Sequence, residues 1–179
     1  MDRDTAEDPE RADRSAAVDL VDPSGGKPAD LFDTLVGSRA RRAITQVVER
    51  GGMLAGCSAG AMIQGERLAG CPDAPGLGLW PGVHVVPHFR RDPAPDRLGD
   101  ERIVGGRCTL VGVDPNAPLL ADDGRYTVIG CRVTVWSSTG KFVFGPGDLP
   151  ASALADRPGG DRWPTAAPRG DAPATRAPE

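Results

Sequence analysis

Apolar residues recur at helical spacing in two neighbouring stretches of the first third of the chain. Leu31, Phe32, Leu35 and Val36 fall on one face of a helix that can begin at Pro28. A second apolar face, made of Ala43, Ile44, Val47 and Val48, predicts a helix over 39–49. Ser38 is suited to cap this helix, and Gly51 and Gly52 end it.

Short apolar runs bounded by Gly, Pro, Asn and Asp predict strands in much of the remaining chain. The expected strands are 16–22, 53–57, 83–89, 108–113, 119–121, 126–129, 133–136 and 142–144, and a short helix is expected over 96–104. The last five runs are separated by turn residues, which indicates an antiparallel meander at a sheet edge. Because helices alternate with strands before the meander, we expect an α/β chain.

Composition limits how much of the chain belongs to this unit. At 179 residues the chain is long enough for one domain with a substantial core. Residues 1–16 are a charged run with almost no large apolar side chain, and 148–179 are dominated by Ala, Pro, Arg, Asp and Gly. Both ends are expected to be solvated tails, which leaves 17–147 as the α/β domain.

Charge and cysteine usage exclude several classes of function. The net charge is −4 and the sequence has no sustained basic stripe, so nucleic acid is not expected as a partner. No run of apolar residues is long enough to span a membrane, and membrane attachment is not expected. The four cysteines lack C-x-x-C spacing, which argues against a structural zinc site and a disulfide scaffold. A cytoplasmic location fits this pattern.

The stretch Gly56-Cys57-Ser58-Ala59-Gly60 carries the clearest chemical signal. An apolar run precedes it and a helix-compatible run follows, as in a nucleophile elbow, where a strained serine projects from a sharp strand-to-helix turn. One alternative is that Ser58 only caps the following helix. Cys57 is a rival nucleophile, although the glycines bracket Ser58.

A serine nucleophile needs a base, and the chain has two histidines, His84 and His88. His88, at the end of a predicted strand, is the better candidate, whereas His84 is expected to be a half-buried or surface residue of that strand. Since the two lie four residues apart on an extended segment, a metal-binding pair is the alternative, but no further ligand cluster accompanies them.

Several motifs occur together in an order that resembles peptidase family S51. They are Gly25-Gly26, the LxxxLxGS pattern at 31–38, the AGCSAGAM elbow at 55–62, GLGLWPG at 76–82 and PHF at 87–89. The segment from Ala17 to Gly147 is similar to the dipeptidase E and cyanophycinase group of that family, within the class I glutamine-amidotransferase-like superfamily. The resemblance implies a flavodoxin-like three-layer sandwich with a mostly parallel sheet. Only 24 residues precede the glycine pair, so the sheet is expected to lack its first strands.

The resemblance also implies roles for individual residues. Ser58 matches the nucleophile and His88 the base, and the oxyanion donors match the backbone amides of Ala59 and of Gly26, with Gly25 as the alternative. The implied reaction is hydrolysis of amide bonds in aspartyl peptides or a cyanophycin-like polymer, with no metal or cofactor. Arginines that face substrate carboxylates are only partly matched, by Arg90, Arg91 and Arg97.

The acidic partner of the histidine is left open between two aspartates. Asp73 follows Ser58 at the offset that the dipeptidase E branch uses, and we favour it. Asp114 lies in the block where the cyanophycinase branch has its acid, but Pro115 stands at the position that matches the glutamate. Either aspartate could instead be a turn residue beside its proline.

Other functions stay open at this level. The chain could be a catalytically impaired relative, a non-enzymatic module that binds an anion or another small ligand, or a general esterase. The expected partner is a peptide or small-molecule substrate, and the sequence leaves a homodimer open.

Overall fold

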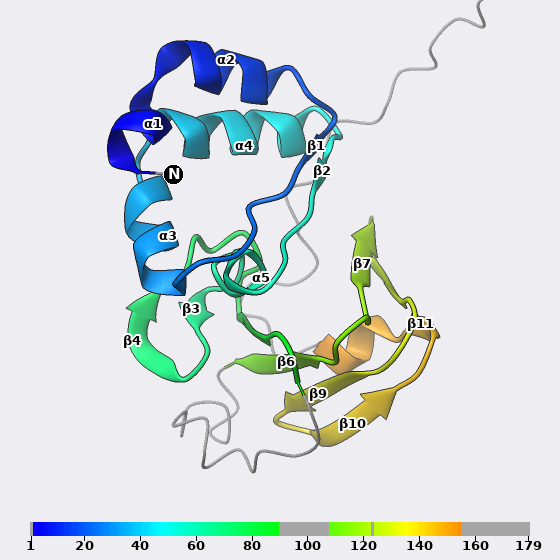
Figure 1. The fold of residues 1–179 in the computed structure, drawn as a ribbon. Coiled ribbons are helices and arrows are strands. Elements are labelled where there is room, and N and C mark those ends of the chain that lie inside the picture. Colours follow the sequence, from blue (N-terminus) through cyan, green and yellow to red (C-terminus); the bar gives the residue numbers. More distant parts are fainter. Residues whose placement is uncertain (1, 90–107, 123, 155–179) are drawn as a thin grey trace, which may run out of the picture.

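The structure is a computed structural model, and it describes residues 2–89, 108–122 and 124–154 (Figure 1). Its helices are α1 (Arg3–Glu7), α2 (Pro9–Ala16), α3 (Pro28–Leu35), α4 (Arg39–Glu49), α5 (Ala59–Met62) and the 3-10 helix η2 (Ala151–Leu154). Its first strands are β1 (Leu20–Val21), β2 (Met53–Leu54), β3 (Arg67–Leu68), β4 (Cys71–Pro75) and β5 (Val83–Val86). The later strands are β6 (Thr109–Val113), β7 (Leu119–Asp122), β8 (Arg125–Val128), β9 (Val133–Ser137), β10 (Gly140–Phe144) and β11 (Gly147–Leu149).

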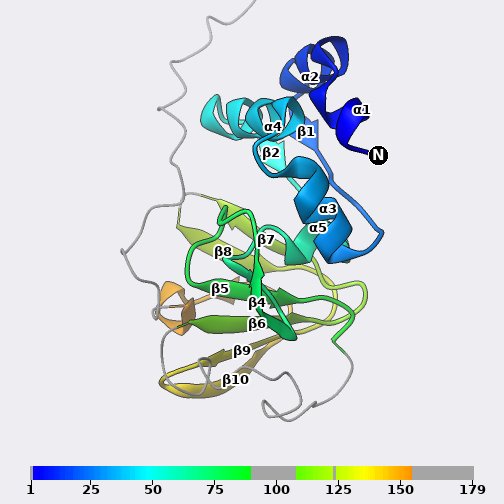
Figure 2. The same cartoon turned by 90° about the vertical axis from the view of Figure 1, so that its left-hand side faces the viewer.

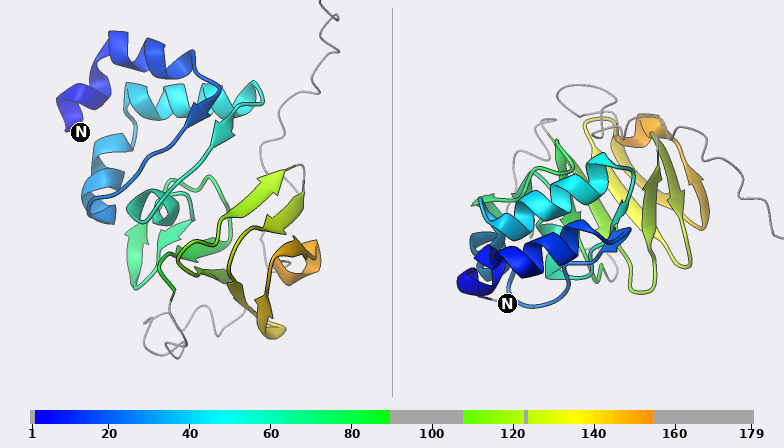
Figure 3. Two further views of the ribbon diagram at one scale, coloured as in Figure 1. Left: turned by 45° about the vertical axis from the view of Figure 1, so that its right-hand side comes forward. Right: turned by 90° about the horizontal axis from the view of Figure 1, so that it is seen from above.

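The N-terminal segment is helical, although the sequence predicts a solvated tail over 1–16. Helix α2 runs beside α4, as the right-hand view of Figure 3 shows, and α1 contacts α3 and α4. Ala6 and Ala12 are the buried residues of the two helices. Small side chains allow a close approach to α4, and the carboxylates of Asp2 and Asp8 cap the helices. The prediction of a solvated tail rested on the absence of large apolar residues. The packing of α1 and α2 uses alanines and does not need large apolar side chains.

Strands β1 and β2 form a parallel pair that leads to the elbow. Leu20 pairs with Met53 and Val21 with Leu54, and an isolated parallel bridge between Ser24 and Cys57 continues the pairing. The buried residues Leu35, Ile44, Ile63 and Leu68 form a core between α3, α4, α5 and β3. The N-cap predicted at Ser38 is present, because its hydroxyl accepts a hydrogen bond from the Arg41 amide at 3.0 Å.

The later strands form one mixed and one antiparallel sheet, and β3 and β4 form an antiparallel pair, so the sheet structure is less parallel than the sequence predicts. Strands β5 and β6 pair in parallel, whereas β9 and β10 continue the same sheet antiparallel in the order β10-β9-β6-β5. Strands β7, β8 and β11 form a separate antiparallel sheet, of which β7 and β8 are labelled in Figure 2. The turns after β7 and β9 are short, and short connections can join only antiparallel neighbours, as in the pairs β7–β8 and β9–β10.

A second core fills the space between these two sheets. Its buried members include Val83, Val111, Val135, Val128 and Leu154. Leu149 and Leu154 are buried although they fall within the predicted tail over 148–179, so ordered structure continues at least to residue 154. The rest of that predicted tail, and the helix predicted over 96–104, lie outside the described residues.

Candidate active site

Ser58 has a backbone conformation that few non-glycine residues adopt. Its φ is 54° and its ψ is −117°, at the junction between the strand segment ending at Cys57 and helix α5. Such a conformation costs of order 1–3 kcal/mol and persists only where its surroundings impose it. Its presence at the predicted nucleophile is what an elbow requires.

The two glycines of the elbow have no room for a side chain. A Cβ atom on Gly60 would lie 1.5 Å from the carbonyl oxygen of Pro23. A Cβ atom on Gly56 would lie 2.0 Å from the side-chain nitrogen of Gln64 and 2.6 Å from the carbonyl oxygen of Gly60. Strand, turn and helix therefore meet at distances that only glycine permits.

The elbow and the glycine pair differ in which of their backbone N–H groups are hydrogen-bonded. The amides of Gly60 and Gly25 both donate to the carbonyl oxygen of Cys57, at 2.9 and 3.4 Å. Within the described part of the chain, the amides of Ala59 and Gly26 have no hydrogen-bond partner. Their role as oxyanion donors stays a prediction, and the bond made by Gly25 makes Gly26 the better candidate of the glycine pair.

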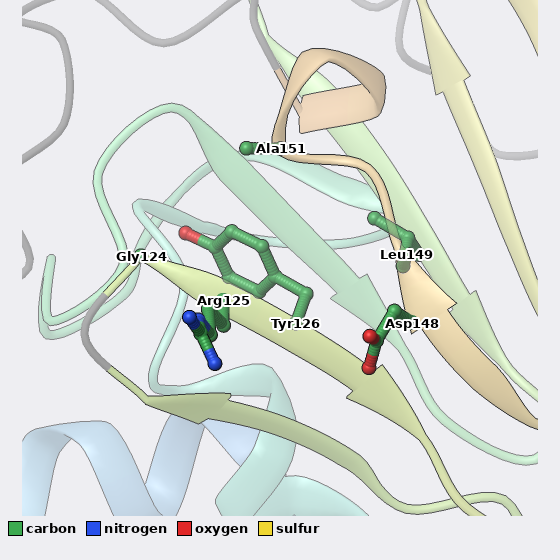
Figure 4. A pocket seen from close by; sticks show the side chains of 6 residues that line it. All are labelled: Gly124, Arg125, Tyr126, Asp148, Leu149 and Ala151. Carbon is green, nitrogen blue, oxygen red and sulfur yellow. The ribbon is translucent and has the colours of Figure 1, made fainter.

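The glycine pair also borders a hollow in the described part of the chain. Gly25 and Gly26 have φ of 72° and 84°, and they line a cavity of about 500 Å³ together with residues of β1, α3 and α4. A smaller hollow of about 260 Å³ lies between β8 and β11, where Figure 4 shows Tyr126 with Arg125 and Asp148 beside it. None of the predicted site residues lines the smaller hollow.

His88 stands just beyond the end of β5, as predicted. It is exposed and has a φ of 55°, and the next residue, Phe89, is buried and donates its amide to the Val113 carbonyl at 2.9 Å. None of the hydrogen bonds among the described residues joins His88 to Ser58. His84 is 1% exposed within β5, so it is fully buried and not the half-buried or surface residue that the sequence predicts.

The two candidate acids have different surroundings. Asp114, at the end of β6, pairs with Arg132, whose Nη2 and Nε both lie 3.1 Å from its Oδ2. Asp73 lies on β4, a strand that is not among those predicted from the sequence, and its side chain lies outside what the structure describes. The predicted substrate residues Arg90, Arg91 and Arg97 also lie outside the described residues.

Gln64 is the residue at this site that the sequence analysis does not single out. Its side-chain nitrogen donates to the carbonyl oxygens of Ala55 and Gly60, at 2.8 and 3.2 Å. A polar residue next to the buried Ile63, six positions after Ser58, is the signal that could have drawn attention to it.

The described residues contain neither a metal-binding cluster nor a helix suited to a membrane. No group of His, Cys, Asp and Glu side chains within 2–89, 108–122 and 124–154 has an arrangement that could hold a metal ion. In the same ranges, no helix combines the length and the apolar character that a bilayer crossing requires.

Comparison with known proteins identifies similar sequences and structures. The model of a family described as Peptidase family S51 matches residues 4–129. No curated protein matches the chain. Among solved structures, a peptidase from an acI-B1 actinobacterium is similar with a TM-score of 0.70 and 25% identity, over 83% of this chain and 66% of that one. A Listeria monocytogenes EGD-e protein assigned to peptidase E has a TM-score of 0.47 and 15% identity, over 76% of this chain and 64% of its own. The chain thus spans slightly less than two thirds of the length of either protein.

Proposed function

Because the chain belongs to peptidase family S51, we propose that it is a serine-type peptidase with Ser58 as its nucleophile. The observation that carries the proposal is the conformation of Ser58, with φ 54° and ψ −117°, imposed by glycines that have no space for a Cβ atom. A serine that only capped helix α5 would accept a bond from an amide of the first turn, but Ser58 makes no side-chain cap bond.

In the proposed reaction the Ser58 hydroxyl attacks the carbonyl carbon of a substrate amide while His88 accepts the hydroxyl proton. The negative charge that develops on the carbonyl oxygen is stabilised by the N–H groups of Ala59 and Gly26. His88 then donates the proton to the leaving amine, and water releases the acyl group from Ser58. No metal or cofactor takes part in these steps.

Asp73 is the proposed acid that orients His88. The alternative, Asp114, already has its carboxylate paired with Arg132 at 3.1 Å and is only 12% exposed. The Asp114 carboxylate therefore stabilises the contact between the end of β6 and the residue before β9. Because it is already engaged there, we favour Asp73 for the catalytic role.

The substrate that we propose is an aspartyl peptide or a cyanophycin-like polymer. The cavity of about 500 Å³ beside Gly25 and Gly26 offers space for a substrate group next to the proposed oxyanion donors. Arg90, Arg91 and Arg97 are the proposed partners of substrate carboxylates, since guanidinium groups bind carboxylates through paired hydrogen bonds.

A flavodoxin-like arrangement and a cytoplasmic location complete the proposal. The parallel pairs β1–β2 and β5–β6, with α4 against β1 and β2, support the first. The free thiols of Cys57, Cys108 and Cys131 support the second, because thiols persist in reducing compartments.

A fluorophosphonate probe tests this function directly, because it forms a covalent bond only with an activated serine. The probe should label the wild-type chain, and the label should be lost in Ser58→Ala and kept in Cys57→Ala. Wild-type protein that has not been exposed to the probe should also hydrolyse aspartyl dipeptides in preference to p-nitrophenyl esters, and labelling should abolish this activity. Absence of labelling in folded protein would favour a ligand-binding module, and ester hydrolysis alone would favour an esterase.

A further inference from the structure

Gln64 joins the two sides of the elbow through one side-chain amide. Its Nε2 donates to the carbonyl oxygen of Ala55, on the strand segment before Ser58, and to that of Gly60, in the helix after it. Both partners are carbonyl oxygens, which can only accept hydrogen bonds, so the amide must present its NH₂ group to them. The two bonds therefore fix the angle at which strand and helix meet around Ser58.

Helix α5 needs such support because it has only four residues. Isolated helices this short do not hold their shape in water. The backbone amide of Gln64 donates to Ala61 rather than to Gly60, at 3.3 Å. The side chain of Gln64 supplies the bond that the Gly60 carbonyl would otherwise receive from the next turn.

The backbone of the same region connects the elbow to the strand that leads to His88. The carbonyl oxygen of Gln64 accepts a bond from the Trp80 amide at 2.8 Å, and the Glu66 amide donates to the Val83 carbonyl at 2.9 Å. Val83 is the first residue of β5, whose far end precedes His88. Gln64 therefore lies where the segment that holds the nucleophile joins the segment that delivers the base.

Gly56 has a second role that depends on Gln64. A Cβ atom on Gly56 would lie 2.0 Å from Nε2 of Gln64, so the first glycine of the elbow leaves the space that this amide occupies. The Gln64 amide can occupy its position only because residue 56 is a glycine, although eight positions separate the two residues in the chain.

From these contacts we infer that Gln64 is a positioning residue, which holds Ser58 and the amide of Ala59 in the geometry that acylation requires. The catalytic part of this inference rests on the proposed peptidase function. The structural part, that the two side-chain bonds of Gln64 order the elbow, does not depend on activity. Gln64 itself touches neither the substrate nor the reacting atoms.

The test compares Gln64→Leu with Gln46→Leu in the full chain. Leucine is similar in size but cannot donate, and Gln46 is an exposed glutamine on α4 that serves as the matched control. Amide hydrogen exchange of a peptide spanning 55–64 should become about tenfold faster in Gln64→Leu, as the loss of a hydrogen bond allows. The control should exchange at the wild-type rate.

Fluorophosphonate titration then separates positioning from folding. In Gln64→Leu every folded molecule should still become labelled, but the rate per titratable site should fall by about tenfold to a hundredfold, as for a small misplacement of reacting groups. The kcat for an aspartyl dipeptide should fall with it, while KM changes little. A purely structural role would lower the number of labelled sites and leave the rate per site unchanged.

The results distinguish a failure of the Gln64 proposal from a failure of the serine peptidase proposal. Unchanged exchange over 55–64, or an unchanged rate per site, would overturn the role of Gln64. Faster exchange together with a wild-type chain that the probe never labels would refute the serine peptidase and leave the ordering of the elbow by Gln64 standing. If Gln64→Leu does not fold, Gln64→Glu replaces it, because a carboxylate keeps the size and loses both donors.

Discussion

The carbonyl oxygen of Pro23 lies directly over the backbone of Gly60, so that a Cβ atom at Gly60 would meet it at 1.5 Å. This contact brings the end of the β1 segment onto the helix of the elbow. Both partners are backbone, so no side-chain movement can relieve the overlap. The glycine pair at 25–26 and the nucleophile are therefore held together by close packing as well as by the bond from Gly25 to Cys57.

We predict that Gly60→Ala destabilises the chain by about 3 kcal/mol, because a methyl group here forces two backbone segments apart. Urea unfolding measures the loss, and the rate of fluorophosphonate labelling should fall in the fraction that stays folded. Gly145→Ala is the control, since no atom lies within 4 Å of its added Cβ. Equal stability of the two variants would contradict the close contact.

Local signals made one helix and the elbow predictable. The predicted bounds of α4, 39–49, agree with Arg39–Glu49, because Ser38, the apolar spacing and Gly51 all act within a few residues of the helix. The positive φ of Ser58 likewise follows from two glycines and a small residue beside it in the sequence.

Features that depend on distant partners were not predictable. Strand β4 contains Pro72 and Pro75, which argue against a strand in a sheet interior, but here it pairs only with β3 as a two-stranded hairpin. Strand β6 pairs in parallel with β5 and antiparallel with β9, and both partners lie far from it in the sequence, so no local pattern specifies the pairing. The sequence alone leaves the catalytic acid open between Asp73 and Asp114 for the same reason. Both aspartates lie in turns or short strands whose partners the sequence does not specify.

Ser38→Ala should lower the free energy of unfolding by about 1–2 kcal/mol, because it removes an N-cap. The hydroxyl of Ser38 is fully buried, donates to the Leu35 carbonyl at 2.8 Å and accepts from Arg41. The rate of labelling per titratable site should not change, since the bonds of Ser38 stay within the α3–α4 connection. Ser152→Ala, at an exposed position in η2, should be neutral in both measurements.

Gly112→Ala should slow the reaction of Ser58 through the strand end that carries His88. A Cβ atom at Gly112 would lie 2.8 Å from the ring of Phe89, which also makes an edge contact with Trp136 at 5.1 Å between centroids. The ring must move, and His88 is its neighbour in the chain. We expect at least a tenfold loss of kcat for an aspartyl dipeptide, as for about 1 Å of misplacement. A variant with normal kcat and lowered stability would show that Phe89 does not position His88.

The identity of the acid is tested by comparing Asp73→Asn with Asp114→Asn. Removing the carboxylate that orients a catalytic histidine lowers kcat by about 10⁴-fold in the best-studied serine triad, and we expect a loss of several hundredfold or more for Asp73→Asn, with little change in stability. Asp114→Asn should instead lower stability, because Arg132 loses an ionic partner that is only 12% exposed. The variant Arg132→Gln breaks the same ion pair from the other side and should match Asp114→Asn in both stability and kcat. If Asp114→Asn loses activity that Arg132→Gln retains, the carboxylate of Asp114 acts on His88 and not only on Arg132, and the catalytic acid belongs to the end of β6.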